Sequence, residues 1–382
     1  MSILTSHKNT SNITDNMLST TNSQHAPWFA TFEELHNKKL WHQLSTKIFE
    51  FIEQAPGPKD LPALYQNFIV NFEMKMNPLK LIEFASQVVT QIDNPDTCIS
   101  LIESLKPKVK HNKMASVLCS IIIGEQSQKK NDKATVQRLL EELSTEIDDV
   151  DGVTPVHARY YLFASDHYQN MGDHCKYYRN SLRYLGCLSD TDATFKVHQP
   201  VHQDRAFTMA LAALLGDEIF NFGELLQHPI INCIEPSKRW VVDLLGAFNS
   251  GDLAAYEALQ PQWSSQPDLV THALDLRKKI ALMCLMEMTF KSHDGILTFE
   301  QIATTARVEL ADVEMLVMRA LSLGLVKGSI DQVNGCVHLW WVQPRVLNKA
   351  QIVSLRSRLE TLCKDVRAIE GLLENKAQEI IS

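Results

Sequence analysis

The sequence predicts a mainly α-helical protein: an α-solenoid of TPR-like helical repeats, then a small winged-helix domain, then one long C-terminal helix. Three changes of pattern lead to this prediction. From Trp28 to Lys291, apolar residues recur at three- and four-residue steps, with short breaks such as "APGPKD" and "DNPD" between the periodic segments. After His293 the period becomes partly that of strands, and from Asn348 onward it is a heptad repeat.

A Gly-Asp pair repeats inside the helical region, at Gly172-Asp173, Gly216-Asp217 and Gly251-Asp252. Glycine readily takes the left-handed conformation that closes one helix, and an aspartate side chain can accept hydrogen bonds from the free N–H groups that open the next. The pairs lie about 35 to 44 residues apart, a period typical of helix-turn-helix solenoids. Chance helix ends are the alternative, but the unbroken helical period around the pairs favours stacked repeats.

The region before the C-terminal helix has the outline of a winged helix. The segment "LTFEQIATTA" predicts a short helix with Thr298 as its cap and Gln301 at the position that completes a capping box. The segment "ELADVEMLVMRALSLG" predicts a second helix that ends at Gly324. "LVKGSID" and "CVHLWWV" then read as strands joined through Asn334-Gly335, which is a strong hairpin signal.

These patterns divide the chain into four parts. Residues 1–26 are rich in Ser, Thr and Asn and poor in large apolar groups, which predicts a disordered tail. Residues 27–170 are expected to form N-terminal helical repeats. Residues 171–346 are expected to form a second domain, with helical repeats to about residue 292 and the winged helix over 293–346. Residues 347–382 are expected to form the C-terminal helix.

Composition and charge argue against a nucleic-acid partner. Hydrophobic residues make up 45% and charged residues 21% of the chain, an ordinary globular profile, and the formal net charge of -8 would repel phosphate backbones. The second predicted helix of the winged helix would have to enter a DNA groove. It opens with Glu309, Asp312 and Glu314 and carries one cation, Arg319, so its carboxylates would meet the phosphates.

The cysteines and the apolar segments bear on the compartment. The chain has 8 cysteines without a C-x-x-C pair, which indicates reduced thiols in a cytosolic or nuclear protein. It has neither an N-terminal apolar segment of the signal-peptide type nor a run of about 18 apolar residues. We therefore expect neither secretion nor a membrane-spanning helix.

No sequence pattern indicates catalysis. The motifs G-x-x-x-x-G-K-[ST], G-x-G-x-x-G, G-x-S-x-G and H-E-x-x-H are all absent, so the corresponding phosphate, dinucleotide, hydrolase and zinc-protease sites lack their residues. One metal-like cluster comprises Cys175, Cys187, His198 and His202. Its His-x-x-x-His spacing suits zinc, but its cysteines are too far apart for a zinc knuckle. We predict no enzyme, no cofactor and no metal site.

The winged helix carries apolar residues beyond those that a small core needs. Met315 and Met318 lie to one side of the main apolar face of their helix, and the adjacent Trp340 and Trp341 must point to opposite faces of their strand. One tryptophan can enter the core, and the other needs a different neighbour. A partner protein would cover these four residues, and the alternatives within the chain are a solenoid helix or the C-terminal helix.

The C-terminal helix carries a second predicted interface. Apolar residues occupy eight of nine a and d positions of a heptad repeat, Lys376 being the exception. They are Ile352, Leu355, Leu359, Leu362, Val366, Ile369, Leu373 and Ile380. Such a seam is typical of helices that pack nearly parallel in a coiled coil or bundle, with neighbouring charges such as Arg358 left at the hydrated rim. At about 1.5 Å per residue the helix is about 50 Å long, so we expect its stripe to pack on other chains. Folding back along its own solenoid is the alternative.

Several segments of the sequence resemble the PCI-domain family, and within it the subunits of the proteasome lid. They are "KKLWHQL" (38–44), "SLRYLGC" (181–187), "FNFGELLQHP" (220–229), "AFNSGD" (247–252), "LMEMTF" (285–290), "GLVKGSID" (324–331) and "WVQPRVL" (341–347). The resemblance runs from about Trp28 to the C-terminus. The tail, residues 1–26, resembles nothing in the family.

The resemblance implies a non-catalytic scaffold subunit of the 26S proteasome regulatory particle lid, present in cytoplasm and nucleus and supporting ubiquitin-dependent degradation. The implied partners are the other PCI subunits, which join through their winged helices into a horseshoe and gather their C-terminal helices in a bundle. A deubiquitinase pair and a ubiquitin receptor would lie nearby in this hetero-oligomer. The alternatives are a PCI subunit of the signalosome or of a translation initiation factor, and a nucleic-acid-binding PCI protein of mRNA export.

Overall fold

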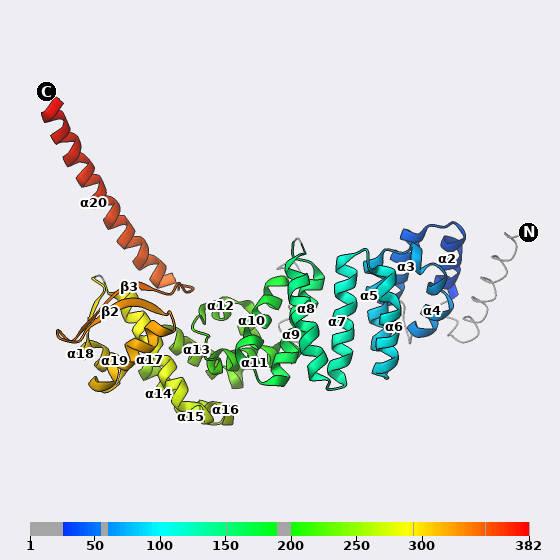
Figure 1. The fold of residues 1–382 in the computed structure, drawn as a ribbon, viewed down its shortest axis with the longest axis horizontal. Coiled ribbons are helices and arrows are strands. Elements are labelled where there is room, and N and C mark those ends of the chain that lie inside the picture. The colour runs from blue at the N-terminus through cyan, green and yellow to red at the C-terminus, as the bar shows by residue number, and fades with distance from the viewer. Residues whose placement is uncertain are drawn as a thin grey trace, which may run out of the picture. The chain divides into compact units, whose positions relative to one another are not determined.

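The computed structural model describes residues 26–54, 60–150, 152–188, 200–292, 294–347 and 349–381 (Figure 1). The predicted tail therefore lies outside the described residues, apart from Ala26. The chain forms two compact units, which are described separately: Met1–Met171 with Arg183–Ser189, and Gly172–Leu182 with Asp190–Ser382. The finer domain limits expected above stay a prediction.

The first unit is built of helices alone over its described residues. They are α2 (Ala26–Asn37), α3 (Trp41–Gln54), α4 (Leu61–Asn67), the short 3-10 turns η2 (Ile69–Asn71) and η3 (Glu73–Lys75), α5 (Pro78–Thr90), α6 (Pro95–Val109), α7 (Lys113–Lys129), α8 (Lys133–Asp148) and α9 (Pro155–Met171). The helices α5 to α8 each begin after an Asn or Asp whose side chain accepts from a backbone N–H of the first turn. These caps are why the predicted helical segments start where the periodicity starts.

A partly buried polar contact joins three helices of this unit. The Arg159 guanidinium on α9 donates to both carboxylate oxygens of Glu125 on α7, at 2.9 and 2.8 Å, and to Ser86 Oγ on α5 at 2.6 Å. One helix turn away, Gly124 lies so close to the Phe163 ring that an added Cβ would stand 2.5 Å from it. The close packing of α7 on α9 therefore depends on a residue without a side chain.

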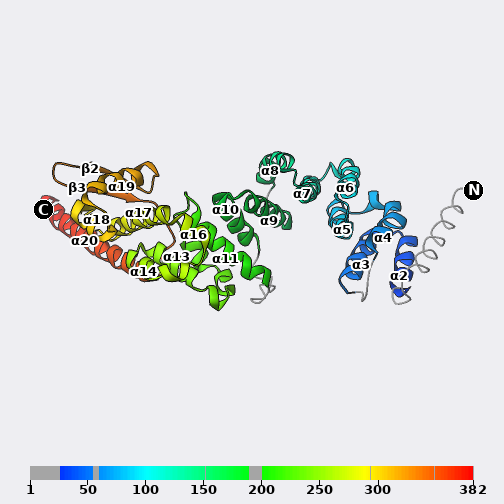
Figure 2. The same ribbon diagram turned by 90° about the horizontal axis from the view of Figure 1, so that it is seen from below.

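The second unit starts with helices and ends with the winged helix. After α10 (His174–Cys187), which runs across the division between the units, come α11 (Pro200–Leu215), α12 (Gly223–Gln227), the 3-10 turns η4 (Pro229–Cys233) and η5 (Pro236–Lys238), α13 (Trp240–Ser250), α14 (Leu253–Ala258), α15 (Gln260–Trp263), α16 (Pro267–Thr271) and α17 (Ala273–Lys291). Helix α17 packs against α18, α19 and β3 of the winged helix, which lie beside it in Figure 2.

Two of the three Gly-Asp pairs have the predicted role. Gly172 and Gly251 are left-handed, with φ of 76° and 66°, and the aspartates that follow them accept from backbone N–H groups of α10 and α14. The prediction is wrong for Gly216-Asp217. Gly216 does not have a positive φ, and α12 begins only at Gly223, after a stretch without regular structure. A dipeptide shows that a helix ends but not how far away the next one starts.

The winged helix consists of β1 (Ile296–Thr298), α18 (Phe299–Ala306), α19 (Leu310–Ser322), β2 (Val326–Asp331) and β3 (Cys336–Val342), with antiparallel strand order β1-β3-β2. The predicted capping box is confirmed, with both the Thr298 and the Gln301 side chains engaged. The hairpin through Asn334-Gly335 is confirmed as well. The strand β1 was not predicted, because three residues are too short to show an alternating pattern.

The chain ends in α20 (Lys349–Ile381), an unbroken helix of 33 residues (Figure 1). The predicted fold class is therefore confirmed: helical repeats, a winged helix and a long C-terminal helix. None of the described helices is long and apolar enough to cross a membrane.

Candidate protein-interaction surfaces

The two methionines of α19 are exposed, as the sequence predicts for residues off the core-facing side. Val313, Val317 and Ala320 are buried and fix which side of α19 faces the core. Met315 and Met318 lie outside that row, with 63% and 43% of their surface exposed. The described chain covers these two flexible apolar side chains only in part, which is typical of surfaces that adapt to a partner.

The tryptophan pair of β3 is split between two environments. Val337 and Leu339 fill the core. Trp341 is paired with Lys327 beside a register shift in the β2–β3 ladder and is half-buried, with the Lys327 ammonium 4.8 Å from its ring centroid. Trp340, the extra residue of that shift, is 69% exposed. The cover that Trp341 needs thus comes from within the chain, whereas Trp340 remains open.

Three further apolar residues, which were not predicted to form an interaction surface, are exposed to solvent. Leu310 opens α19, Leu323 follows its last turn and Ile296 opens β1, and all three are exposed. Their positions at the ends of elements are the only signal that could have identified them, because periodicity alone assigns such residues to the core.

The apolar stripe of α20 is uncovered along all its described length. The seven described members from Ile352 to Leu373 are between 38% and 63% exposed. The side chain of Ile380 lies outside the described residues. Because none of these seven residues is buried, this part of α20 does not fold back along the helices of its own unit.

The start of α20 is fixed to α17 through one buried carboxylate. Glu287 of α17 pairs with the Arg345 guanidinium, and both side chains are buried. The same carboxylate accepts from Gln351 Nε2 at 3.2 and 3.1 Å and lies 3.4 Å from the Lys291 ammonium. Arg345 also donates to the Asn249 carbonyl at 2.9 Å. The connection between β3 and α20 therefore has defined contacts on α17.

Arg358 extends this attachment, which corrects the prediction that it is a hydrated rim charge. Its guanidinium donates to the carbonyls of Phe290 and Lys291, at 3.1 and 3.0 Å, and lies over the Phe290 ring. These carbonyls belong to the last turn of α17, where a cation is favoured by the helix dipole. Only the part of α20 beyond Arg358 projects its stripe without contacts of this kind in the described chain.

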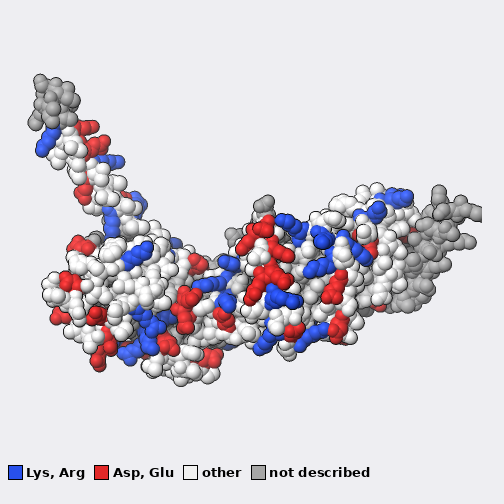
Figure 3. All heavy atoms as spheres, viewed as in Figure 1, with Lys and Arg blue, Asp and Glu red and all other residues white. Residues whose placement is uncertain are grey.

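The start of α19 carries the negative charge that the sequence predicts. Glu309 is the N-cap residue of α19 and Asp312 lies in its first turn, so the end of the helix that would enter a groove is acidic. On the face that Figure 3 shows, Lys and Arg side chains are interspersed with Asp and Glu, except for a small group of basic side chains over α17. A continuous basic stripe is not visible on that face.

The cysteine and histidine cluster predicted to be non-metallic does not assemble in the described chain. Cys175 and Cys187 are half-buried thiols at opposite ends of α10, and His198 lies outside the described residues. No group of possible metal ligands among the described residues includes either thiol or His202.

A different trio, which the sequence reasoning missed, comes together on the hairpin. The ligand atoms of Asp331, Cys336 and His338 lie within 4.8 Å of one another. The backbone N–H and side-chain amide of Asn334 donate to the Asp331 carboxylate at 3.1 and 2.7 Å and lower its pKa. Both carboxylate oxygens of Asp331 are therefore engaged in closing the turn of the hairpin.

Helical repeats that lead into a winged helix, with an anchored amphipathic helix behind it, define a PCI-domain protein. Two family descriptions match the chain: "PSD13 N-terminal repeats" over residues 28–245 and "PCI domain" over residues 253–341. The chain belongs to the family of the 26S proteasome non-ATPase regulatory subunit 13.

Relatives from three kingdoms of organisms support this assignment over nearly the full length. The 26S proteasome non-ATPase regulatory subunit 13 homolog A of Arabidopsis thaliana is 33% identical, covering 96% of this chain and 97% of the relative. The subunit 13 of Dictyostelium discoideum is 31% identical over 92% of this chain and 93% of its own length. The 26S proteasome regulatory subunit RPN9 of Saccharomyces cerevisiae is 32% identical over 93% and 94%.

Proposed function

We propose that the chain is a non-catalytic scaffold subunit of the 26S proteasome regulatory particle lid in cytoplasm and nucleus. Its partners are other PCI subunits of the lid, with the deubiquitinase pair and the ubiquitin receptor nearby. The observation that carries the proposal is the stripe of α20: an apolar heptad seam, exposed along its described length, on a helix whose first turns are fixed to α17. Its relatives are named as non-ATPase regulatory subunits, which supports a role without catalysis.

The geometry of α20 suits a helical bundle better than a flat docking site. A seam with a period of about 3.5 residues packs into a partner helix of similar period, and a single exposed seam leaves the remaining faces hydrated. The anchor at Glu287 and Arg358 orients the first turns. Fixing the base of the helix before assembly lowers the entropy that its partners must offset.

The winged-helix surface suits a second, lateral contact. Met315, Met318 and Trp340 are exposed, and aromatic and methionine side chains are enriched where protein interfaces are most deeply buried. Trp341 contributes less than we expected from the sequence, because Lys327 already covers part of its ring. Two separate apolar surfaces on one chain fit a subunit that holds more than one neighbour.

Family membership favours the lid over the other complexes considered. A signalosome or initiation-factor assignment has no separate support in the structure. A nucleic-acid-binding role would require the acidic start of α19 to approach phosphates, which electrostatics disfavours.

The test compares two variants of α20 in cells. Leu359→Asp combined with Leu373→Asp places charges in the stripe, where assembly would have to desolvate them, whereas Arg367→Glu changes a charge on the same exposed helix outside the seam. We expect the double variant to lose about tenfold or more of its co-purifying lid subunits, measured by affinity purification and quantitative mass spectrometry, and Arg367→Glu to lose little. Normal recovery of lid subunits with the double variant would contradict the role of the stripe.

A truncation provides a second test, provided that it keeps the contacts that fix the start of α20 to α17. Cutting after Arg345 would also remove Val346, which packs against Gly223 and whose N–H donates to Asn221. Cutting after Glu360 keeps these contacts and Arg358. We therefore expect this shorter deletion to preserve folding while it abolishes the bundle contact.

A further inference from the structure

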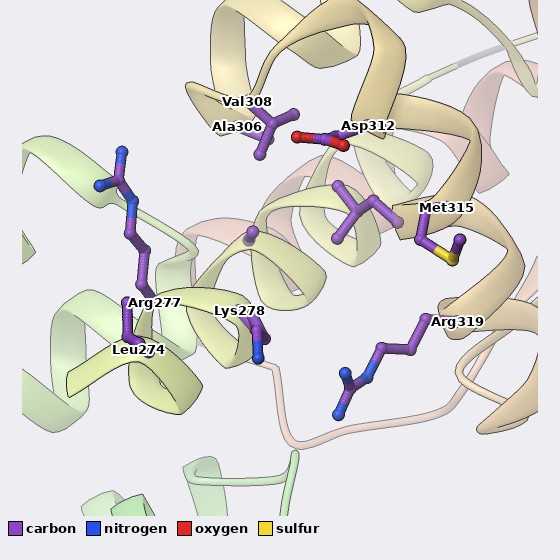
Figure 4. A pocket seen from close by; sticks show the side chains of 10 residues that line it. Leu274, Arg277, Lys278, Ala306, Val308, Asp312, Met315 and Arg319 are labelled. Carbon is purple, nitrogen blue, oxygen red and sulfur yellow. The ribbon is translucent and has the colours of Figure 1, made fainter. Parts of the chain in front are cut away.

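A groove of about 400 Å³ lies between α17 and the winged helix, within the second unit (Figure 4). One wall is the exposed side of α17, and the other is α19 with the turn that precedes it. The lining residues are Leu274, Arg277, Lys278, Ala281, Ala306, Val308, Asp312, Met315, Leu316 and Arg319.

The apolar part of the lining is open to solvent. Leu274 on α17 and Met315 on α19 line opposite walls of the groove and are 76% and 63% exposed (Figure 4). Ala281 and Ala306 are buried beneath them. A groove of this volume accommodates one or two apolar side chains of a ligand rather than a whole helix face.

The charged part of the lining is mainly positive, in a chain whose formal net charge is -8. Arg277, Lys278 and Arg319 line the groove against a single carboxylate, Asp312. Lys278 forms an exposed pair with Asp275 at 3.3 Å, a contact that contributes little. Among the ion pairs of the described residues, none engages the guanidinium of Arg277 or Arg319. Both side chains are exposed, so their N–H donors are accessible to a ligand.

The walls of the groove are formed in the chain alone. Helix α18 closes on Arg307 in the left-handed conformation, with φ of 50°, and the Arg307 guanidinium pairs with Glu257. This residue directly precedes Val308, so the turn between α18 and α19 has a defined path. A ligand would not have to order the wall, which lowers the cost of binding.

We propose that this groove binds an acidic segment of a partner protein, anchored by one or two large apolar side chains. The apolar side chains would contact Leu274 and Met315, and carboxylates on either side of them would pair with Arg277 and Arg319, whose planar guanidinium groups bind carboxylates through two parallel hydrogen bonds. The inference deepens the proposed function and rests on it for the source of the segment, a neighbouring lid subunit.

The apolar lining favours a peptide over a nucleic acid. A phosphate backbone would pair with the basic side chains but would leave Leu274 and Met315 without contacts. An acidic peptide with apolar side chains would contact both the apolar and the basic residues of the groove. Single-stranded oligonucleotide is accordingly included as a competitor in the test.

The test measures peptide binding to the isolated full-length chain by fluorescence anisotropy. The probe is a labelled 12-residue peptide with two leucines at positions i and i+4 and glutamates on both sides, and its matched control carries lysines in place of the glutamates. We expect the acidic peptide to bind about tenfold or more tightly than the basic one, and the difference to shrink with added salt.

Variants decide whether binding occurs in the groove. Arg277→Glu with Arg319→Glu should weaken binding of the acidic peptide about tenfold and reverse the preference, and Leu274→Ser with Met315→Ser should weaken binding of both peptides. Arg367→Glu on α20 should change neither. Equal binding of the two peptides, an unchanged preference in the charge-reversed variant, or displacement of the acidic peptide by oligonucleotide from the groove would overturn the proposal. The variant with Leu359→Asp and Leu373→Asp should retain peptide binding even if it fails to enter the lid, so the two proposals fail separately.

Discussion

Helices α17 and α20 are the two long helices of the second unit, and they differ in how far their apolar residues are buried. In the second half of α17, residues on every side of the helix are buried, including the run from Ile280 to Met286. In α20, the described apolar residues of the seam are all exposed. The difference follows from patterning, since a helix that is apolar all round must be surrounded, whereas a narrow seam needs only one neighbour. Within the part of the chain that the structure describes, no such neighbour covers the seam of α20.

The two helices meet at Glu287, the polar residue on which both depend. It is buried on α17 and receives Arg345 and Gln351 from the connection to α20 and its first turn. A buried carboxylate is tolerated only when it is paired, so this contact both stabilises α17 and sets the direction in which α20 starts.

The largest expected effect comes from removing that carboxylate. Glu287→Ala leaves the buried Arg345 guanidinium without its partner, and we expect the free energy of unfolding to fall by about 3 kcal/mol or more. The matched control is Glu360→Ala, which removes an exposed pair with Arg356 on α20 and should cost about 0.5 kcal/mol or less. Urea titration followed by circular dichroism measures both. Similar changes for the two variants would mean that the α17 anchor is not a buried pair.

A second comparison removes an equal apolar volume from each helix. Leu285 is fully buried in α17 and Leu359 is exposed on α20. We expect Leu285→Ala to destabilise the isolated chain by about 3 kcal/mol, because it leaves a cavity, and Leu359→Ala to stay within about 0.5 kcal/mol. The same urea titration applies. A large loss for Leu359→Ala would show that α20 is covered by its own chain in solution.

The smallest expected effect concerns the one lysine buried in α17. The Lys279 ammonium donates to the carbonyls of Ala213, Leu214 and Gly216 at 2.8, 3.0 and 2.6 Å, at the end of α11. Burial lowers the pKa of Lys279 from 10.5 to about 7. Between these two pH values the unfolded chain binds a proton that the folded chain does not. The free energy of unfolding therefore rises with pH in this window, and below about pH 7 it does not depend on the titration of Lys279.

This dependence is measured between pH 7 and pH 8.5 by comparing the natural chain with a variant that lacks only the Lys279 ammonium. We expect the free energy of unfolding to rise by about 1 kcal/mol more in the natural chain than in Lys279→Met, which cannot titrate. Parallel curves for the two proteins would show that the three carbonyls keep the ammonium charged throughout this range. Lys278→Met, on the exposed side of the same helix, serves as the control.

Much of the site was predictable because its signals are local. Helical geometry places Met315 and Met318 outside the core-facing side of α19. The exposed seam of α20 follows from its heptad period, which is typical of a helix that packs along another helix and not of one that faces a globular core. The groove was not predictable, since Leu274 and Met315 are far apart in the sequence and meet only when α19 packs on α17. The role of Arg358 was mistaken for the same reason, because its carbonyl partners belong to another helix.

The sequence by itself determined where helices and strands form, which faces are apolar, how the capping box at Thr298 starts α18 and where the hairpin turns, since each depends on residues within one or two turns of one another. Only the tertiary structure decided which apolar faces are covered and which stay exposed. Trp341 is half-covered by Lys327 while its neighbour Trp340 is open, and nothing in the local pattern distinguishes the two. Burial depends on elements that are remote in sequence, and a local pattern carries no information about where those elements lie.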